Sequence, residues 1–450
     1  MQLSHYTIIV KNYPEKEKHL LFNTRTQGMV KINEELRKLV ENYYAPRNFS
    51  LKVKYCNELE QLYKMGILVN NEEDDRKKLG SFFHQLKHDV RKSCLQATIL
   101  TTYACNFQCV YCFEEGSRKD VSMDISTADQ AMQWLKKNIE RLGYESLSIT
   151  FYGGEPLLNK PVLEHIATHL KNWCEKKNIG FKFTLQTNGY LMTPECIDKY
   201  LKLGLCRARV SVDGPADVHD LNRPLRGGGK TFDRIMENIL ASIDKVTICI
   251  STSYQQDDIG HIEKLLDYFD KLGILNKLDD FVFSPIQPSL GPNSQPKQIR
   301  MVECMGNYED EVLVSANTKI QELMRKRKLP FKGGMTVTAC PLTMENGSVV
   351  IDQEGRIYKC NSMLGYPEFA VGDVRQDEFN DRNKEFVNID AWKKCPEDCV
   401  YLPMCSGGCR FMSYLYNKNF TTPVCKKNYL DKMTPAFIKR EYEALTGTAQ

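Results

Sequence analysis

Apolar residues in the middle of the chain follow two spacings, which alternate from about residue 95 to residue 285. Short strand-like runs alternate with longer segments that repeat their apolar positions at helical spacing. The expected strands are 96–102, 146–152, 182–186, 207–212, 245–252 and 280–284, and the expected helices include 127–141, 162–176, 194–203 and 232–243. Strands joined by helical crossovers predict an α/β fold with a parallel sheet.

The first 92 residues follow a different pattern. Two strand-like runs, 6–10 and 19–23, precede helical patterns at 33–42 and 56–64, a short apolar run at 67–69 and a charged stretch at 71–78. A hairpin, helices and a returning strand indicate a winged-helix-like domain over residues 1–92. A structural cap and a nucleic-acid-binding winged helix are the alternatives, although the segment lacks a basic recognition helix.

The last part of the chain has few long periodic segments. After an expected charged helix at 303–328, two short strand-like runs at 348–352 and 356–359 turn at Gly355. We therefore divide the chain into 1–92, an α/β region 93–330, a cysteine-rich region 331–430, and a helix or tail at 431–450.

Composition narrows the class of protein. A chain of 450 residues with 42% hydrophobic residues suggests several packed domains. The net charge of +4 is small and both signs are interspersed, so we expect no nucleic-acid partner. Neither a signal-peptide pattern nor an apolar run near ~18 residues is present, so we expect a cytoplasmic protein without a membrane partner.

Ten of the 17 cysteines fall into two ordered groups, which in a reducing compartment argues for metal chemistry and against disulfides. Cys105, Cys109 and Cys112 follow the first expected strand with CxxxCxxC spacing. Three thiolates on one loop can hold three irons of a [4Fe–4S] cluster and leave the fourth iron open. Structural zinc is the alternative, but it normally takes four ligands from paired elements.

Polar residues and glycines follow the next three expected strands. Gly153, Gly154 and Glu155, followed by Pro156, come after the second strand. Glycines let the backbone approach a ligand closely, and a carboxylate can accept hydrogen bonds from an ammonium group. Asn188 follows the third strand, and Ser211 and Asp213 end the fourth. Parallel α/β folds place ligand sites at these strand ends, although ordinary tight turns would use similar residues.

The CxxxCxxC loop and the GGEP run together resemble the radical S-adenosylmethionine (radical SAM) superfamily. The resemblance implies a partial (β/α)6 TIM-like barrel over residues 93–330 and reductive cleavage of SAM to a 5′-deoxyadenosyl radical. Cys105, Cys109 and Cys112 would hold the catalytic cluster. It also implies SAM contacts from Gly153, Gly154, Glu155, Asn188, Ser211, Asp213 and Arg223, with Phe113 near the adenine.

The C-terminal cysteines resemble the SPASM extension of radical SAM enzymes, which implies two auxiliary [4Fe–4S] clusters and three clusters in all. The ligands implied for the first are Cys340, Cys360 and Cys409, and for the second Cys395, Cys399, Cys405 and Cys425. A zinc ribbon would account for only four of these. Cys395 and Cys399 are separated by three residues, one more than in the usual CxxC of the family.

The same resemblance implies a substrate and an electron donor. SPASM enzymes modify ribosomally made peptides, so the expected partners are a precursor peptide with a leader and a flavodoxin- or ferredoxin-type reductant. The domain at 1–92 would bind the leader as an added strand. The sulfatase-maturing branch has an aspartate base after its GxxxxC cysteine, where this chain has Asn361, which cannot accept a proton as a carboxylate does.

Residues 341–347 contain no cysteine to complete the first auxiliary cluster. Either Cys304 supplies the fourth thiolate or one iron is open. An open iron could bind a substrate cysteine as its thiolate, which makes thioether cross-linking the leading hypothesis. Formylglycine formation in a sulfatase and other peptide oxidation are alternatives, and a non-catalytic iron–sulfur electron-transfer or scaffold protein is an alternative of another class.

Overall fold

Six parallel strands form the centre of the computed structural model, which describes residues 1–45, 49–88, 93–112, 121–255, 259–290, 296–300, 311–329 and 340–447. The strands are β6 (Leu95–Thr102), β7 (Ser146–Gly153), β8 (Gly180–Thr187), β9 (Leu205–Ser211), β10 (Thr247–Gln255) and β11 (Asp280–Leu290). Each pairs in parallel with the next along the chain. The predicted α/β fold with a mostly parallel sheet is confirmed.

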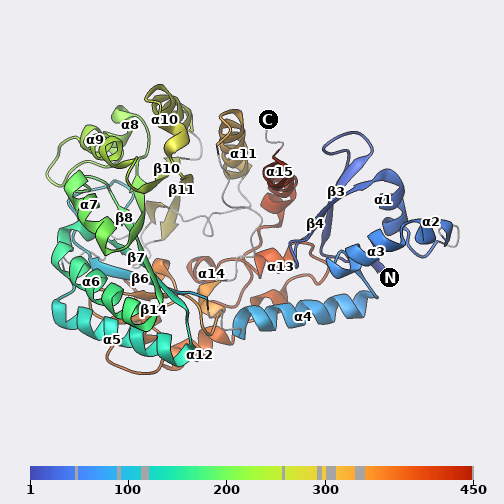
Figure 1. Ribbon diagram of the computed structural model, residues 1–450, viewed down its shortest axis with the longest axis horizontal. Coiled ribbons are helices and arrows are strands. Elements are labelled where there is room, and N and C mark those ends of the chain that lie inside the picture. Colours follow the sequence, from blue (N-terminus) through green and yellow to red (C-terminus); the bar gives the residue numbers. More distant parts are fainter. Residues whose placement is uncertain are drawn as a thin grey trace.

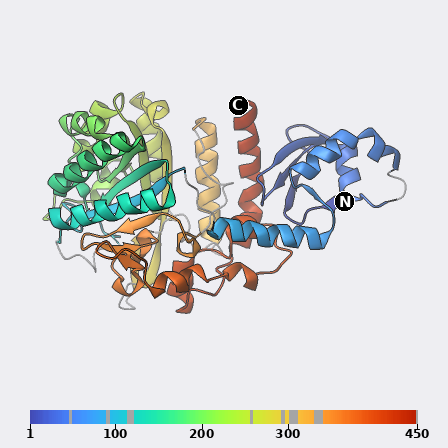
Figure 2. The same cartoon turned by 60° about the horizontal axis from the view of Figure 1, so that its bottom comes forward.

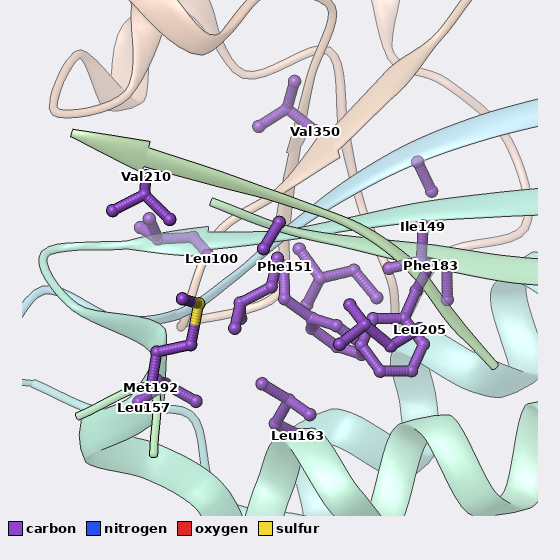
Figure 3. Close-up of a cluster of buried hydrophobic side chains, with 14 of the residues drawn as sticks. Leu100, Ile149, Phe151, Leu157, Leu163, Phe183, Met192, Leu205, Val210 and Val350 are labelled. Atoms are coloured by element: carbon purple, nitrogen blue, oxygen red, sulfur yellow. The ribbon is translucent and has the colours of Figure 1, made fainter. Parts of the chain in front are cut away.

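Helices follow the strands and cover the outer side of the curved sheet (Figure 1). They are α5 (Ile125–Leu142), α6 (Lys160–Lys177), α7 (Pro194–Leu203), α8 (Ala216–Asn222), α9 (Phe232–Ser242) and α10 (Gly260–Lys271). Side-chain caps explain where two of them begin, because Asp124 accepts from the Thr127 N–H and Thr193 from the Cys196 N–H. In the core between the layers, Phe151 and Phe183 of the sheet lie over Leu163 of α6 (Figure 3).

The sheet continues beyond the barrel strands at both edges. At one edge β13 (Val349–Ile351) pairs in parallel with β6, and β14 (Arg356–Tyr358) and β15 (Gly372–Asp373) follow in antiparallel order. At the other edge β12 (Pro296–Arg300) pairs antiparallel with β11. The hairpin predicted around Gly355 is therefore present, and it joins the C-terminal region to the barrel through main-chain hydrogen bonds.

The N-terminal region contains more regular structure than its sequence pattern indicated. Its strands are β1 (Gln2–Leu3), β2 (Thr7–Val10), β3 (Lys18–Asn23), β4 (Met29–Asn33) and β5 (Leu68–Val69), and its helices are α1 (Glu34–Glu41), α2 (Phe49–Lys54), α3 (Cys56–Lys64) and α4 (Glu72–His88). Strands β2, β3 and β4 form one antiparallel sheet, and β1 pairs with β5. The charged stretch at 71–78 belongs to the 17-residue helix α4. The description as winged-helix-like stays a prediction.

The two ends of the described chain pack together. The remaining helices are α11 (Glu311–Lys326), α12 (Asp381–Val387), α13 (Leu402–Cys405), α14 (Arg410–Asn417) and α15 (Lys427–Thr446). Met433 and Phe437 of α15 pack against Leu20 and Phe22 of β3, while α1 and α3 cover the other face of that sheet. Figures 1 and 2 show α15 standing beside the N-terminal sheet. Position 431, where we expected a C-terminal helix or tail to begin, lies inside α15.

The C-terminal helices are mostly short. No helix in the described ranges is both long enough and apolar enough to cross a lipid bilayer.

Candidate active site

The loop that carries the first three cysteines follows β6 and is fixed by main-chain hydrogen bonds. The Gln108 N–H donates to the Pro224 carbonyl (2.9 Å), and the Val110 N–H donates to the Asn222 carbonyl (3.1 Å). Cys105 and Cys109 are buried and Cys112 is half-buried. The loop is thus held against the segment after α8, which also supplies Arg223.

The two glycines at the end of β7 pack directly against the chain that enters this loop. The Gly154 and Glu155 N–H groups donate to the Thr102 and Ala104 carbonyls, each at 2.9 Å. A Cβ atom on Gly153 would lie 2.4 Å from the Thr102 carbonyl oxygen, and one on Gly154 would lie 2.4 Å from that of Ala104. Both positions require glycine because any side chain would clash with backbone that cannot move without displacing the cysteines.

The Glu155 carboxylate is fully buried and joins the ends of two strands. It accepts hydrogen bonds from the Thr187 hydroxyl (2.8 Å), the Asn188 N–H (2.7 Å) and the Leu157 N–H (3.0 Å). Burial raises the pKa of Glu155 to about 7, while these hydrogen bonds act to lower it. The carboxylate therefore organises the strand ends, and its predicted direct contact with SAM stays a prediction.

Asp213 and Arg223 form a buried ion pair behind the cysteine loop. Arg223 Nε donates to Asp213 Oδ2 at 2.9 Å, and the Ser253 N–H donates to Asp213 Oδ1 at 2.9 Å. The Tyr111 hydroxyl also donates to Asp213. Burial alone would raise the pKa of Asp213, but the charge of Arg223 and these donors hold it below its ordinary value. Asp213 thereby orients Arg223, whose Nη1 lies 3.9 Å from Cys109 Sγ.

A cavity of about 100 Å³ opens between the cysteine loop and the strand ends. Among the sequence-predicted residues, its lining includes Cys105, Cys109, Cys112, Gly153, Gly154, Asn188, Ser211 and Arg223. The Glu155 and Asp213 carboxylates lie behind this lining, bonded to residues that form it. Phe113 lies outside the described residues.

Sequence reasoning missed three groups at this cavity, which are Phe107, Tyr111 and Tyr152. Gln186 and Thr187, which directly precede Asn188 at the same strand end, also line it. Tyr111 lies between two of the cysteines, so its position in the sequence could have indicated it. The packing of Phe107 edge-on to Tyr190, with ring centroids 5.8 Å apart, depends on the fold.

Three C-terminal thiols come together near β14. Burial, together with the neighbouring Cys409 and Cys360 thiols, raises the pKa of Cys340 to about 12. Burial and Cys409 likewise raise the pKa of Cys360 to about 11. Cys304, the alternative fourth ligand, lies outside the described residues.

Four other thiols form a second group. Burial, together with the nearby Cys405, Cys399 and Cys425 thiols, raises the pKa of Cys395 to about 11. Burial and Cys425 also raise the pKa of both Cys399 and Cys405. Three of the C-terminal cysteines thus lie near one another and four others form a second group, while their assignment to two clusters stays a prediction.

The spacing of these donors bears on the metal they could hold. Among the described residues, no three His, Cys, Asp or Glu side chains lie close enough together to hold a single metal ion. Each of the two sets consists only of thiols, which are the usual ligands of iron–sulfur clusters.

The N-terminal region contacts the loop that carries Cys395 and Cys399. The Tyr6 hydroxyl donates to the Glu397 carbonyl (3.2 Å), and the Thr24 hydroxyl donates to the Val400 carbonyl (2.6 Å). Phe83 of α4 stacks on Trp392, with ring centroids 4.5 Å apart. This loop is one residue longer than the usual CxxC loop, and its turn contacts residues that lie far away in the sequence.

Comparisons with known proteins agree with this geometry. Residues 99–269 match the family model of the Radical SAM superfamily. The cysteine-type anaerobic sulfatase-maturating enzyme of Clostridium novyi is 22% identical over 328 residues, which are 68% of this chain and 85% of that enzyme. The radical SAM cyclopropyl synthase TigE of Paramaledivibacter caminithermalis is 24% identical over 52% of this chain and 54% of its own.

Two solved structures share the fold. Native anSMEcpe with bound AdoMet aligns with a TM-score of 0.60 at 18% identity, covering 78% of this chain and 100% of that chain. Streptococcus suis SuiB bound to precursor peptide SuiA aligns with a TM-score of 0.53 at 16% identity, covering 95% of this chain and 99% of that chain. The SuiB likeness therefore extends over nearly the whole chain.

Proposed function

Because this chain has a radical SAM domain and is a radical SAM enzyme related to known maturases, we propose that it modifies a ribosomally made peptide. The observation that carries the proposal is the cavity where three cysteines, two glycines and a buried arginine meet at parallel strand ends. A [4Fe–4S] cluster and SAM, when bound there, supply a 5′-deoxyadenosyl radical. The residues of the chain hold and orient that pair.

Each residue of the cavity has a distinct task in this proposal. Cys105, Cys109 and Cys112 hold the cluster, and the backbone of Gly153 and Gly154 receives the methionine end of SAM. Asn188 and Ser211 contact SAM from the next strand ends. Arg223, oriented by Asp213, places its positive charge beside Cys109, where it favours the thiolate and attracts the SAM carboxylate.

We assign two auxiliary [4Fe–4S] clusters to the C-terminal thiol groups, which brings the total to three. Cys340, Cys360 and Cys409 hold the first, and Cys395, Cys399, Cys405 and Cys425 hold the second. Their mutual proximity within each group supports this assignment. A flavodoxin- or ferredoxin-type protein is the electron donor in this proposal.

The N-terminal region is the proposed binding site for the leader of the precursor peptide. The SuiB likeness covers this region, and the described sheet ends at the edge strand β4, whose Lys31 is exposed. An edge strand offers unpaired main-chain groups to an added strand. The turn after β2 is instead held against α15, since the Tyr13 hydroxyl donates to Glu443.

Site-specific photo-crosslinking tests the leader site. A photoreactive residue at Lys31 should capture the precursor peptide, whereas the same residue at the exposed Lys11, just after β2, should not. Capture from Lys11 alone would move the peptide to the other edge of the sheet, and capture from neither position would contradict strand addition to this sheet.

The proposed modification is a thioether bond between a peptide cysteine and carbon, with formylglycine formation as the second candidate. Asn361, at the start of a short turn after Cys360, favours the first because it lacks a basic carboxylate. The sulfatase-maturating relatives favour the second. Mass spectrometry of the treated peptide separates them: a thioether removes two hydrogens and protects the thiol from alkylation, whereas formylglycine replaces the cysteine sulfur with oxygen and also removes two hydrogens. Absence of 5′-deoxyadenosine from the reduced, reconstituted enzyme would contradict both.

A further inference from the structure

Arg410 is a cation in the interior of the cysteine-rich region. It directly follows Cys409 and opens α14, and its side chain is among the largest fully buried ones, at 1% exposure. Burying a guanidinium group is costly unless its donors and its charge are both compensated. Other groups must therefore compensate both the donors and the charge of Arg410.

Backbone carbonyls from two loops satisfy the donors. Arg410 Nη1 donates to the Phe420 and Thr422 carbonyls at 2.9 and 3.0 Å. Arg410 Nη2 donates to the Gly407 carbonyl and, at 3.1 Å, to the Gly408 carbonyl. Gly407 and Gly408 lie between Cys405 and Cys409, and Thr422 lies just before Cys425. One side chain thus joins loops that carry ligands of both thiol groups.

Cysteine sulfurs lie near this charge, and as iron-bound thiolates they would compensate it. In the described part of the chain these partners of the guanidinium are all carbonyls, and no Asp or Glu forms an ion pair with it. Burial lowers the pKa of Arg410, and four cysteines act to raise it: Cys340, Cys409, Cys405 and Cys395. Two of these belong to each thiol group. Cys340 and Arg410 also line one small cavity, and the Arg410 main-chain N–H donates to the Cys340 thiol.

We propose that Arg410 is a positioning residue shared by the two auxiliary clusters, and that its charge raises the reduction potentials of both. The inference rests on the proposed assignment of those clusters. A thiolate-ligated cluster gains one negative charge on one-electron reduction, so a fixed buried cation nearby stabilises the reduced form more than the oxidised form. Electron delivery to both clusters then depends on one side chain.

Potentiometric titration of the reconstituted full chain, followed by EPR, tests this. In R410Q, both auxiliary clusters should become at least tenfold harder to reduce at a given potential, a shift of about 59 mV each to lower potential. R410K keeps the charge and should recover most of that shift. R375Q is the control, because Arg375 is an exposed arginine of the same region paired with Asp373. The cluster whose EPR signal changes when SAM is added serves as the internal reference and should keep its potential.

The outcomes distinguish the role of Arg410 from the assignment of the auxiliary clusters. Unchanged auxiliary potentials in an R410Q variant with its full iron content would overturn the role of Arg410. If R410Q loads less iron, R410K must restore both the iron and the potentials, and failure to restore the potentials would also overturn it. A wild-type chain that holds only about four irons would instead contradict the three-cluster assignment.

Discussion

The cavity beside Cys105, Cys109 and Cys112 and the C-terminal cysteine region are built in opposite ways. The cavity takes its groups from the ends of adjacent strands of one sheet, and backbone hydrogen bonds such as Gly154 to Thr102 fix them locally. The C-terminal thiols lie on loops and at the ends of short helices. Contacts between separate segments of the chain hold those loops. They include the Tyr6 hydrogen bond to Glu397 and the hydrogen bonds of the buried Arg410. The first site is thus a product of the fold, whereas the second requires the two ends of the chain to meet.

The largest effect should come from removing the ligands of the cavity. Replacing Cys105, Cys109 and Cys112 together by Ala should lower the iron content by about four from about twelve per chain. Formation of 5′-deoxyadenosine should vanish, while the auxiliary EPR signals should remain. Iron analysis and chromatography of the products measure both. Continued SAM cleavage in this variant would refute the assignment of the cavity.

The sequence pattern predicted the first region better than the second, for physical reasons. Buried apolar residues recur at regular spacing along the barrel strands β6 to β9, often at every second position, so periodicity located them. Strand β4 was missed because Lys31 interrupts a short run, and α4 because only a few apolar residues, such as Leu79 and Phe83, mark its buried side. The cysteine spacings indicated the candidate ligands but not the residues that support their loops. From the sequence alone, an arginine after a cysteine is expected at the surface. Arg410 is buried because two loops meet around it.

Deleting residues 1–92 should damage the second region more than the first. The deletion exposes the apolar side of α15 and frees the loop that carries Cys395 and Cys399. We expect iron content to fall by about four per chain, while SAM cleavage persists. A truncated enzyme that keeps about twelve irons and modifies the precursor at the full rate would show that the two ends need not meet.

A single substitution tests the same contact with less disruption. Phe83→Ala removes the ring stacked on Trp392 and should destabilise the protein by roughly 3–5 kcal/mol, as large-to-small changes of buried aromatics do. Phe82→Ala, at the neighbouring and less buried ring, is the matched control. Thermal denaturation and the EPR signal of the second auxiliary cluster measure the effect. Equal losses in both variants would mean that the stack on Trp392 has no special role.

The cavity should make stability depend on pH through Glu155. Its pKa is raised to about 7 by burial, so the carboxyl's contribution is fully present below about pH 4.5 and is lost as pH rises through about 7. At 1.36 kcal/mol per pKa unit the loss is ~3 kcal/mol. The thermal unfolding midpoint of the wild type should therefore fall as the pH rises from about 5 to about 8.

Glu155→Gln should flatten this dependence. The variant should also be less stable at low pH, because both carboxylate oxygens accept hydrogen bonds and the new amide would turn N–H groups towards a donor. Glu145→Gln, at an exposed position nearby in the sequence, should leave the wild-type slope unchanged. A Glu155→Gln profile as steep as that of the wild type would remove Glu155 as the cause.

The smallest effect should come from the ion pair at the docked loop. Arg76 Nε lies 3.3 Å from Glu397, but their side chains are 61% and 74% exposed, so solvent screens the attraction. Arg76→Gln should change stability by no more than ~0.5 kcal/mol and leave the iron content unchanged. Tyr6→Phe, which removes a partly buried hydrogen bond to the same loop, should cost ~1 kcal/mol. Arg76→Gln could instead lower the stability as much as Tyr6→Phe, and high salt could abolish this loss. The ion pair would then contribute as much as the hydrogen bond to holding the N-terminal region against the loop that carries Cys395 and Cys399.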